Sequence, residues 1–228
     1  MLSSVRYNGA TMETKSLGFI MDGNRRWAKA KGLDPWDGHK AGVNTFINTL
    51  KWLEDTEVEH VAYYAFSSEN WKRSEQEISE LMKLFSELLI DRREELLEQN
   101  IRVRFIGDRK KLSNVIRRAM SEIEKISAGH RRTVWICLSY GGRDELIAAA
   151  RRPSSWFGNF ENNLWSAEMP DLDLVIRTGG NQRLSNFLLW KAAYAELSFT
   201  DTLWPDLQEQ EFKDILEQAS ERVVNNGA

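Results

Sequence analysis

Three short stretches of the sequence concentrate side chains that can bind an anion or move a proton. The first comprises Asp22, Gly23, Asn24, Arg25, Arg26 and Trp27. Glycine and asparagine suit a tight turn, the N–H groups at the start of a following helix attract anions, and the two arginines add positive charge. These residues fit a phosphate cradle. Taken alone, however, they slightly favour an ordinary strand-to-helix turn with solvated arginines over a phosphate site.

The second stretch is a dense group of hydroxyl, carboxylate, amide and guanidinium side chains. It comprises Ser67, Ser68, Glu69, Asn70, Trp71, Lys72 and Arg73. The structural alternative is a loop that leads into a helix cap, which the following Ser74 partly supports.

The third stretch places two arginines and a serine around a Gly-Gly turn. It comprises Arg177, Thr178, Gly179, Gly180, Asn181, Gln182, Arg183, Leu184 and Ser185. These groups can grip a diphosphate, because charge-assisted hydrogen bonds contribute about 1.5–3 kcal/mol each. A solvated turn is again the alternative, although three such clusters together are harder to explain by chance than one.

The elements that must position these clusters alternate between strands and helices. Short runs rich in Val, Ile, Phe, Tyr or Trp predict strands at Leu17–Met21, His60–Phe66, Ile101–Ile106, Thr133–Tyr140 and Leu172–Thr178. Helical spacing predicts helices at Ala41–Glu54, Glu75–Gln99, Lys110–Ile126, Asp144–Arg151 and Gln208–Val224. This order predicts an α/β fold with a central, mostly parallel sheet flanked by helices on both faces. Ligands bind beyond the carboxyl ends of such strands, so the three clusters are expected at one edge.

The helix after Ser74 is the clearest of the predicted helices. Ser74 and Glu77 form a capping-box pattern. One apolar stripe follows, formed by Ile78, Leu81, Met82, Phe85, Leu88 and Leu89. Its default role is core packing. The stretch Pro153–Pro170 instead predicts an irregular excursion or one short helix.

Composition limits the class of protein. The chain has 228 residues, which predicts a single domain over residues 1–228, with residues 1–15 flexible. A formal net charge of −3 predicts no nucleic-acid binding and makes any anion site local. Nine Trp and ten Phe require either a dense core or an apolar ligand.

Several common sites are absent from the sequence. The lone cysteine, Cys137, excludes an internal disulfide and multi-cysteine zinc sites, and favours a reducing compartment. No P-loop, dinucleotide fingerprint or nucleophile elbow is present. Of the three histidines, only His39 lies near a cluster, so it is the candidate for a ligand or proton role. No apolar run is long enough to cross a bilayer, which predicts a cytoplasmic protein that can still associate with a membrane surface.

The motifs together closely resemble the cis-prenyltransferases, the family of undecaprenyl and dehydrodolichyl diphosphate synthases. The resemblance rests on Phe19–Ala28, Gly38–Gly42, Tyr64–Trp71, Tyr140–Arg143, Asp173–Gly180, Ser185–Trp190, Tyr194–Leu197 and Leu203–Asp206. These segments occur in order over nearly the whole chain, so the resemblance is specific. The all-helical trans-type synthases use Asp-Asp-rich motifs, and this chain has no Asp-Asp pair.

The resemblance implies a role for each cluster. An allylic diphosphate, typically farnesyl diphosphate, would bind with its diphosphate on Gly23–Arg26, and Asp22 would lie next to Mg2+. Isopentenyl diphosphate would be held by Arg177, Arg183 and Ser185. The further substrate-binding residues implied are Trp27, His39, Ser67, Ser68, Glu69, Trp71, Arg73 and Leu184.

The resemblance also implies proton handling, assembly and a path for the product. Asn70 and Ser68, with His39, would position or relay the proton, and Asn70 is interpreted as an orienting group because an amide is a poor base. Glu196 of the partner subunit would help to hold Mg2+ in a homodimer. The growing chain would enter a tunnel between the sheet and the helix after Ser74, and membrane contact would come through this product.

Four departures from the family pattern point to weaker or altered activity. One is the segment Asp144–Pro170, which is shorter than in the long-chain bacterial enzymes. Pro35 stands where an arginine is usual and cannot bind a phosphate. Asn225-Asn226-Gly227 replaces a C-terminal Arg-x-Gly, and Gln182 replaces a common histidine. Two alternatives to a chain-elongating homodimer therefore stay open, namely a synthase of short or irregular prenyl diphosphates and a subunit that needs a partner chain.

Overall fold

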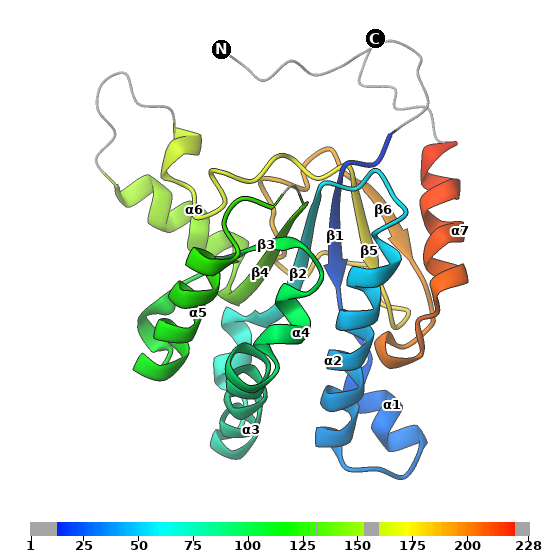
Figure 1. Ribbon diagram of the computed structural model, residues 1–228, viewed down its shortest axis with the longest axis horizontal. Coiled ribbons are helices and arrows are strands. Elements are labelled where there is room, and N and C mark those ends of the chain that lie inside the picture. Colours follow the sequence, from blue (N-terminus) through cyan, green and yellow to red (C-terminus); the bar gives the residue numbers. More distant parts are fainter. Residues whose placement is uncertain (1–12, 131, 153–159, 222–228) are drawn as a thin grey trace.

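The computed structural model describes residues 13–130, 132–152 and 160–221 (Figure 1). Six strands form one sheet in the order β3-β4-β2-β1-β5-β6, and every neighbouring pair is parallel. The strands are β1 (Ser16–Ile20), β2 (His60–Ser67), β3 (Ile101–Ile106), β4 (Arg132–Tyr140), β5 (Leu174–Arg177) and β6 (Glu196–Phe199). The predicted α/β fold with a parallel sheet is confirmed, and so are all five predicted strands. The sixth, β6, was not predicted, because its four half-buried residues carry no extended apolar run.

The helices differ from the prediction mainly at their ends. They are α1 (Asn24–Ala30), α2 (Pro35–Trp52), α3 (Glu75–Ser86), α4 (Arg93–Leu97), α5 (Asn114–Ile126), α6 (Gly142–Arg151) and α7 (Glu209–Ser220). α2 begins at Pro35 rather than Ala41, because the Asp34 side chain caps the helix and proline suits its first turn. The predicted helix Glu75–Gln99 is interrupted by a π-helical turn, η2 (Glu87–Asp91).

One face of the sheet is covered by α2, α3, α5 and α7. In Figure 1, α3 lies below the strands and α7 stands beside β6. The buried apolar side chains of these four helices form the larger core with the strand residues that point to the same side. Phe19 and Tyr63 lie at its centre with their rings stacked at 5.3 Å, and Phe46 and Phe212 pack against them. The apolar stripe after Ser74 takes part in this core, as its spacing predicts.

The opposite face of the sheet packs mainly against irregular chain. Met169, Leu172, Phe187 and Leu188 are buried there. α6 lies beside them, and its buried Glu145 accepts a hydrogen bond of 2.6 Å from the Tyr140 hydroxyl. Within the excursion predicted over Pro153–Pro170, a single 3-10 turn forms at Phe160–Asn163, and residues 153–159 lie outside the described residues.

The parallel strands bring the three polar clusters to one edge. β1 lies between β2 and β5, and the register pairs Ile20 with Arg177 at their carboxyl ends. The segments that follow these three strands are therefore neighbours in space, although they are far apart in the sequence. Residues 1–12 of the segment predicted to be flexible lie outside the described residues, whereas Lys15 is hydrogen-bonded to Asp173. Within the described ranges, no helix is both long and apolar enough to span a bilayer.

Candidate active site

Asp22 lies at the centre of the polar edge, two residues beyond β1. Its Oδ2 accepts hydrogen bonds from Arg177 Nη2 (2.9 Å) and Asn181 Nδ2 (2.8 Å), and its Oδ1 accepts one from Arg26 Nη2 (3.1 Å). The Thr178 hydroxyl fixes the backbone of Asp22 by donating to its carbonyl oxygen and accepting from its N–H. Burial alone would raise the pKa of the Asp22 carboxyl, but the hydrogen bonds from Arg177 and Asn181 outweigh it and hold the pKa below its ordinary value. Asp22 is therefore an ionised carboxylate held in place by three donors.

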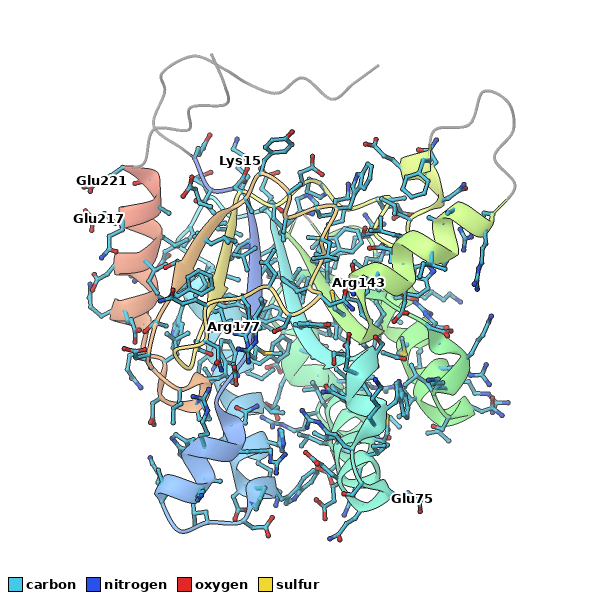
Figure 2. The ribbon with its side chains drawn as sticks, turned by 180° about the vertical axis from the view of Figure 1, so that it is seen from behind. Lys15, Glu75, Arg143, Arg177, Glu217 and Glu221 are labelled. Carbon is cyan, nitrogen blue, oxygen red and sulfur yellow. The ribbon has the colours of Figure 1, made fainter. Side chains whose placement is uncertain are left out.

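Arg177 joins the first cluster to the third. Its side chain is almost fully buried at the end of β5, and Figure 2 shows it at the edge of the sheet opposite Lys15. Besides Asp22, it donates to Ser185 Oγ at 2.7 Å and to the carbonyl oxygen of Arg183. Its Nε is buried without a partner among the described residues. The loop that carries Ser185 is strained, since Ser185 has φ 48° and Asn186 has φ 68°.

The turn at Gly23 brings α1 close to the site. Gly23 has φ 119°, and a Cβ there would lie 2.9 Å from Leu203 Cδ2, so only glycine fits. No side chain caps the start of α1, which leaves backbone N–H groups available to a ligand. The Trp27 indole donates to Asp206 Oδ1 at 2.6 Å and so anchors the far side of α1.

Arg25 and Arg73 converge on the carboxylate of Glu77, whose sequence pattern indicates only a helix cap. Glu77 Oε1 lies 2.8 Å from Arg73 Nη1 and 3.5 Å from Arg25 Nη1. Ser74 caps α3 as predicted, because its hydroxyl accepts from the Glu77 N–H. The Glu77 carboxylate, however, binds the two arginines, which ties the first cluster to the second.

The second cluster is partly structural. Ser67 and Asn70 cap the short helix η1 (Ser68–Lys72) reciprocally, with the Ser67 N–H donating to Asn70 Oδ1 at 3.0 Å. The helix-cap alternative therefore holds for these two residues. Ser68 Oγ contacts Glu69 at 3.4 Å, and Asn186 donates to Glu69 Oε1 at 2.9 Å, which links the second and third clusters.

His39 and Asn24 present polar atoms without partners. His39 Nε2 and Asn24 Oδ1 are buried and have no hydrogen-bond partner among the described residues. Burial, with a contribution from Arg73, lowers the pKa of His39 to about 4, so its imidazole is neutral at physiological pH. A neutral imidazole nitrogen without a partner can accept a proton or a hydrogen bond from a ligand.

An apolar cavity lies directly beneath these two residues. It has a volume of about 80 Å³ and lies between the sheet, α2, α3 and η2. The residues that line it include Asn24, His39, Phe46, Tyr63, Ala65, Leu81, Phe85, Leu88, Phe105 and Ile136. The predicted space between the sheet and the helix after Ser74 thus exists, and Asn24 and His39 line it among mostly apolar side chains.

A second, open hollow of about 610 Å³ lies on the outer side of the turn. Arg25, Arg26, Lys29 and Pro35 line it. Pro35 occupies the first turn of α2, where it contributes neither charge nor an N–H donor.

The predicted residues do not all meet within one chain. Glu196 begins β6 and pairs with Leu174, three residues before Arg177, which places it about 10 Å from the site edge along the strand. Leu184 packs with the smaller core rather than in the charged cluster. Asn181 and Asn186 were not singled out, although both lie in or beside the Arg177–Ser185 stretch.

Asp22 offers a metal ion a single carboxylate, and this suits Mg2+. Among residues 13–130, 132–152 and 160–221, no group of three or more His, Cys, Asp or Glu side chains can enclose a metal. Mg2+ typically binds through one or two carboxylates, with substrate phosphates and water completing its shell. A single ionised carboxylate beside arginines therefore fits Mg2+ held jointly with a phosphate ligand, and does not fit a fully protein-bound metal.

Comparisons with known proteins agree on one family. Residues 20–227 match the family model described as putative undecaprenyl diphosphate synthase. The chain is 40% identical over 222 residues to the isoprenyl transferase of Agrobacterium fabrum, covering 92% of this chain and 90% of that protein. It is 38% identical over 221 residues to the farnesyl-diphosphate-specific ditrans,polycis-undecaprenyl-diphosphate synthase of Escherichia coli K12, covering 91% and 87%.

Solved structures agree with the sequence comparisons. Lavandulyl diphosphate synthase from Lavandula x intermedia, in complex with dimethylallyl diphosphate, superposes with a TM-score of 0.88 at 30% identity, covering 95% of this chain and 99% of that one. A probable undecaprenyl diphosphate synthase from Campylobacter jejuni gives 0.80 at 33% identity, covering 95% and 100%.

Proposed function

We propose that this chain, which belongs to the undecaprenyl diphosphate synthase family, condenses isopentenyl diphosphate with an allylic diphosphate at the site around Asp22. The first allylic substrate would be farnesyl diphosphate. The chain is a prenyltransferase that elongates prenyl diphosphates with cis geometry, as the sequence predicts. The identity of its substrates and the role of each site residue are what we propose below.

The observation that carries the proposal is the junction of a cationic edge with an apolar cavity. Arg26 and Arg177 lie around Asp22 at the edge of the sheet, and His39 stands where the cavity begins. A prenyl diphosphate has the same division, with a polyanionic head and a hydrocarbon tail. Burial of the tail contributes about 0.8 kcal/mol per CH2, which favours repeated addition without release.

The allylic diphosphate would bind on the turn Gly23–Arg26. The uncapped N–H groups of α1 and the guanidinium groups of Arg25 and Arg26 would contact its oxygens. The bond between the allylic carbon and the diphosphate oxygen breaks, and these donors stabilise the charge that develops on the leaving diphosphate. Trp27 and Arg73 would support this turn through Asp206 and Glu77.

Isopentenyl diphosphate would bind to Arg177, Arg183 and Ser185. The contact between Arg177 and Ser185 preforms this site, and the exposed Arg183, which donates to Asn181 Oδ1 at 3.2 Å, would turn to a phosphate. The isopentenyl double bond attacks the allylic carbon, and a proton is then lost to leave a cis double bond.

The second cluster and His39 would handle this proton. Neutral His39 has a nitrogen without a partner to accept it, while Ser68 and the capped Asn70 would orient the reacting groups. Ser67, Glu69 and Trp71 would hold this loop in position through Asn70, Asn186 and Ser139.

The cofactor of the proposed reaction would be Mg2+. Asp22 would hold it, and bound Mg2+ would supply positive charge to the diphosphate oxygens. Glu196 would reach a site only from a partner subunit, so the proposal includes a homodimer. Two exposed aromatic side chains close to β6 in sequence support such an interface, Trp190 at 39% and Tyr194 at 82% exposure.

The reaction would take place in the cytoplasm, and contact with a membrane would come through the hydrocarbon product. Residues 1–228 would form one domain. The single sheet to which all six strands belong supports one domain, and a lone buried Cys137 fits a reducing compartment.

A short or irregular prenyl diphosphate is the second candidate product. The cavity of about 80 Å³ favours it, because a short hydrocarbon requires less displacement of the cavity walls than a long one. The test is incubation of the purified chain with farnesyl diphosphate, labelled isopentenyl diphosphate and Mg2+. Long labelled lipid supports the elongating homodimer, and a product of one or two additions supports the short-chain synthase. No turnover contradicts both and favours a subunit that needs a partner chain.

A further inference from the structure

Asn186, the residue directly after Ser185, is hydrogen-bonded to two other segments of the site edge. Its Oδ1 accepts from the backbone N–H of Arg143 at 2.8 Å, and its Nδ2 donates to Glu69 Oε1 at 2.9 Å. Its carbonyl oxygen accepts from the N–H of Gly142 at 2.8 Å. Glu69 belongs to η1, and Arg143, labelled in Figure 2, belongs to α6. One asparagine therefore joins three segments that are far apart in the sequence.

The partners of Asn186 determine which way its amide group points. A backbone N–H can only donate, so the oxygen of the amide faces Arg143. Burial would raise the pKa of the Glu69 carboxyl, but its hydrogen bonds, first among them the one from Asn186, hold the pKa below its ordinary value. The amide nitrogen thus donates to an ionised carboxylate, which makes the contact a charge-assisted hydrogen bond.

The backbone around Asn186 adopts a conformation that few residues tolerate. Ser185, Asn186 and Leu188 have φ angles of 48°, 68° and 37°, all in the left-handed region. Asparagine enters this region more readily than most residues, and such strain persists only where surrounding contacts hold the chain. The two side-chain hydrogen bonds of Asn186 are contacts of this kind. They therefore help to fix the position of the neighbouring Ser185.

Gly141 allows the second and third clusters to meet at one point. A Cβ on Gly141 would lie 2.5 Å from Ser68 Oγ and 2.8 Å from Asn186 Nδ2, so both side chains lie against the same backbone atom. Ser68 Oγ also lies 3.4 Å from Glu69 Oε2. These contacts form a continuous path from the proton-handling cluster to the proposed isopentenyl diphosphate site.

We propose that Asn186 is a positioning residue that holds the isopentenyl diphosphate site and the proton-handling cluster in a fixed relation. The inference rests on the proposed function, because it acts through the roles proposed for Ser185 and Ser68. Asn186 acts on Ser185 through the backbone and on Ser68 through Glu69. Isopentenyl diphosphate bound at Ser185 would then present its reacting carbons at a defined place relative to Ser68.

The test exchanges the donor and the acceptor of the hydrogen bond between Asn186 and Glu69. Steady-state kinetics with farnesyl diphosphate, isopentenyl diphosphate and Mg2+ are compared for the wild type, Asn186→Asp, Glu69→Gln and the double variant. Asn186→Asp keeps the oxygen that accepts from Arg143 but places a second carboxylate against Glu69. In the double variant, the amide introduced at position 69 donates to the carboxylate introduced at position 186, so the hydrogen bond returns with its direction reversed.

The expected result is a change that affects one substrate and is reversed by the exchange. In Asn186→Asp the KM for isopentenyl diphosphate should rise about tenfold or more and kcat should fall, because a charge-assisted hydrogen bond is replaced by repulsion. The KM for farnesyl diphosphate should stay within about twofold of the wild-type value. The double variant should recover at least about fivefold in kcat/KM over Asn186→Asp. A double variant no more active than Asn186→Asp, or an equal rise in both KM values, would overturn the assignment.

Asn100→Asp is the matched control. Asn100 also has a left-handed backbone, with φ 52°, but it is exposed and precedes β3 at the opposite edge of the sheet. This variant should keep the wild-type kinetic constants. A change in the KM for isopentenyl diphosphate equal to that of Asn186→Asp would show that any such substitution has this effect, and would contradict the role of Asn186.

A second variant covers loss of folding. If Asn186→Asp gives no cooperative thermal transition, Asn186→Gly removes both side-chain hydrogen bonds without adding a charge, and glycine adopts φ 68° freely. It should show the same selective rise in the KM for isopentenyl diphosphate. A wild-type chain that incorporates no label contradicts the proposed function itself. A wild-type chain that elongates, together with an Asn186→Gly enzyme with unchanged KM and kcat, contradicts only the role of Asn186.

Discussion

Replacing Asp22 by asparagine tests the charge balance at the centre of the site. The substitution keeps the size of the side chain but removes the negative charge that Arg26 and Arg177 share. Arg177 is the partner with most to lose, because its side chain is only 5% exposed and has no other carboxylate among its hydrogen-bond partners. In the Asp22→Asn variant the buried Arg177 guanidinium therefore loses the carboxylate that balances its charge.

The size of the effect follows from the contacts. Hydrogen bonds to charged groups contribute roughly 1.5–3 kcal/mol each, and the asparagine oxygen replaces part of that. Asp22 itself is 28% exposed, so water offsets part of the loss. We expect a loss of about 2 kcal/mol in the free energy of unfolding, or about 4–8 °C in the thermal midpoint of a domain of this size. Turnover should fall by about 100-fold or more, since the carboxylate that would hold Mg2+ at the leaving diphosphate is lost.

The pH dependence of the thermal midpoint gives the sharper assay. The pKa of Asp22 is lower in the folded chain than its ordinary value, so its stabilisation is complete above that ordinary value and is lost as the pH falls through the folded value. The midpoints of wild type and Asp22→Asn should differ by a constant amount above about pH 5 and converge below about pH 4. Glu209→Gln is the control, because its exposed pair with Lys213 is expected to contribute little. Equal midpoints at pH 7, or a difference that does not narrow as the pH falls below about 4, would refute the reasoning.

Three other substitutions have defined outcomes. Pro35→Arg adds a guanidinium beside Arg25 and Arg26 in the open hollow and should lower the KM for the allylic diphosphate; steady-state kinetics showing an unchanged or higher KM would contradict a missing anchor. Gly23→Ala places a Cβ 2.9 Å from Leu203 Cδ2 on a residue with φ 119°. The free energy of unfolding should therefore fall by roughly 1–3 kcal/mol, measured as a lower thermal midpoint, and activity should be lost. Arg183→Ala should raise the KM for isopentenyl diphosphate about tenfold or more with little change in stability, because Arg183 is exposed and donates only to Asn181 within the described residues; an equal change in both substrate KM values would argue against a dedicated site.

The sequence predicts the site edge because its signals are local. Each of the three clusters directly follows a strand, and the strands are recognisable as short apolar runs. Once the strands are parallel, their carboxyl ends share one edge, so Asp22, Ser67 and Arg177 become neighbours without any further information. The hydrogen bond from Arg177 to Asp22 spans 155 residues of sequence and is a consequence of this topology.

What the sequence does not predict depends on pairs that carry no local signal. Thr49 lies on α2 and Tyr63 on β2, and only the packing of helix on sheet brings their hydroxyls together. Glu77 has the pattern of a helix cap, yet its carboxylate binds Arg73 and Arg25, because these cations reach it from other elements. The π-helical turn at Glu87–Asp91 likewise has no proline or glycine to announce it.

Chromatography of the labelled product tests the central claim most directly. The purified chain is incubated with farnesyl diphosphate, labelled isopentenyl diphosphate and Mg2+, and the dephosphorylated products are separated by length and by double-bond geometry. Membership of the cis-prenyltransferase family predicts labelled polyprenols in which every added unit is cis, and the proposed role of Asp22 predicts none when Mg2+ is chelated or when Asp22 is replaced. Added units with trans geometry, or the same product from Asp22→Asn at the wild-type rate, would contradict the account.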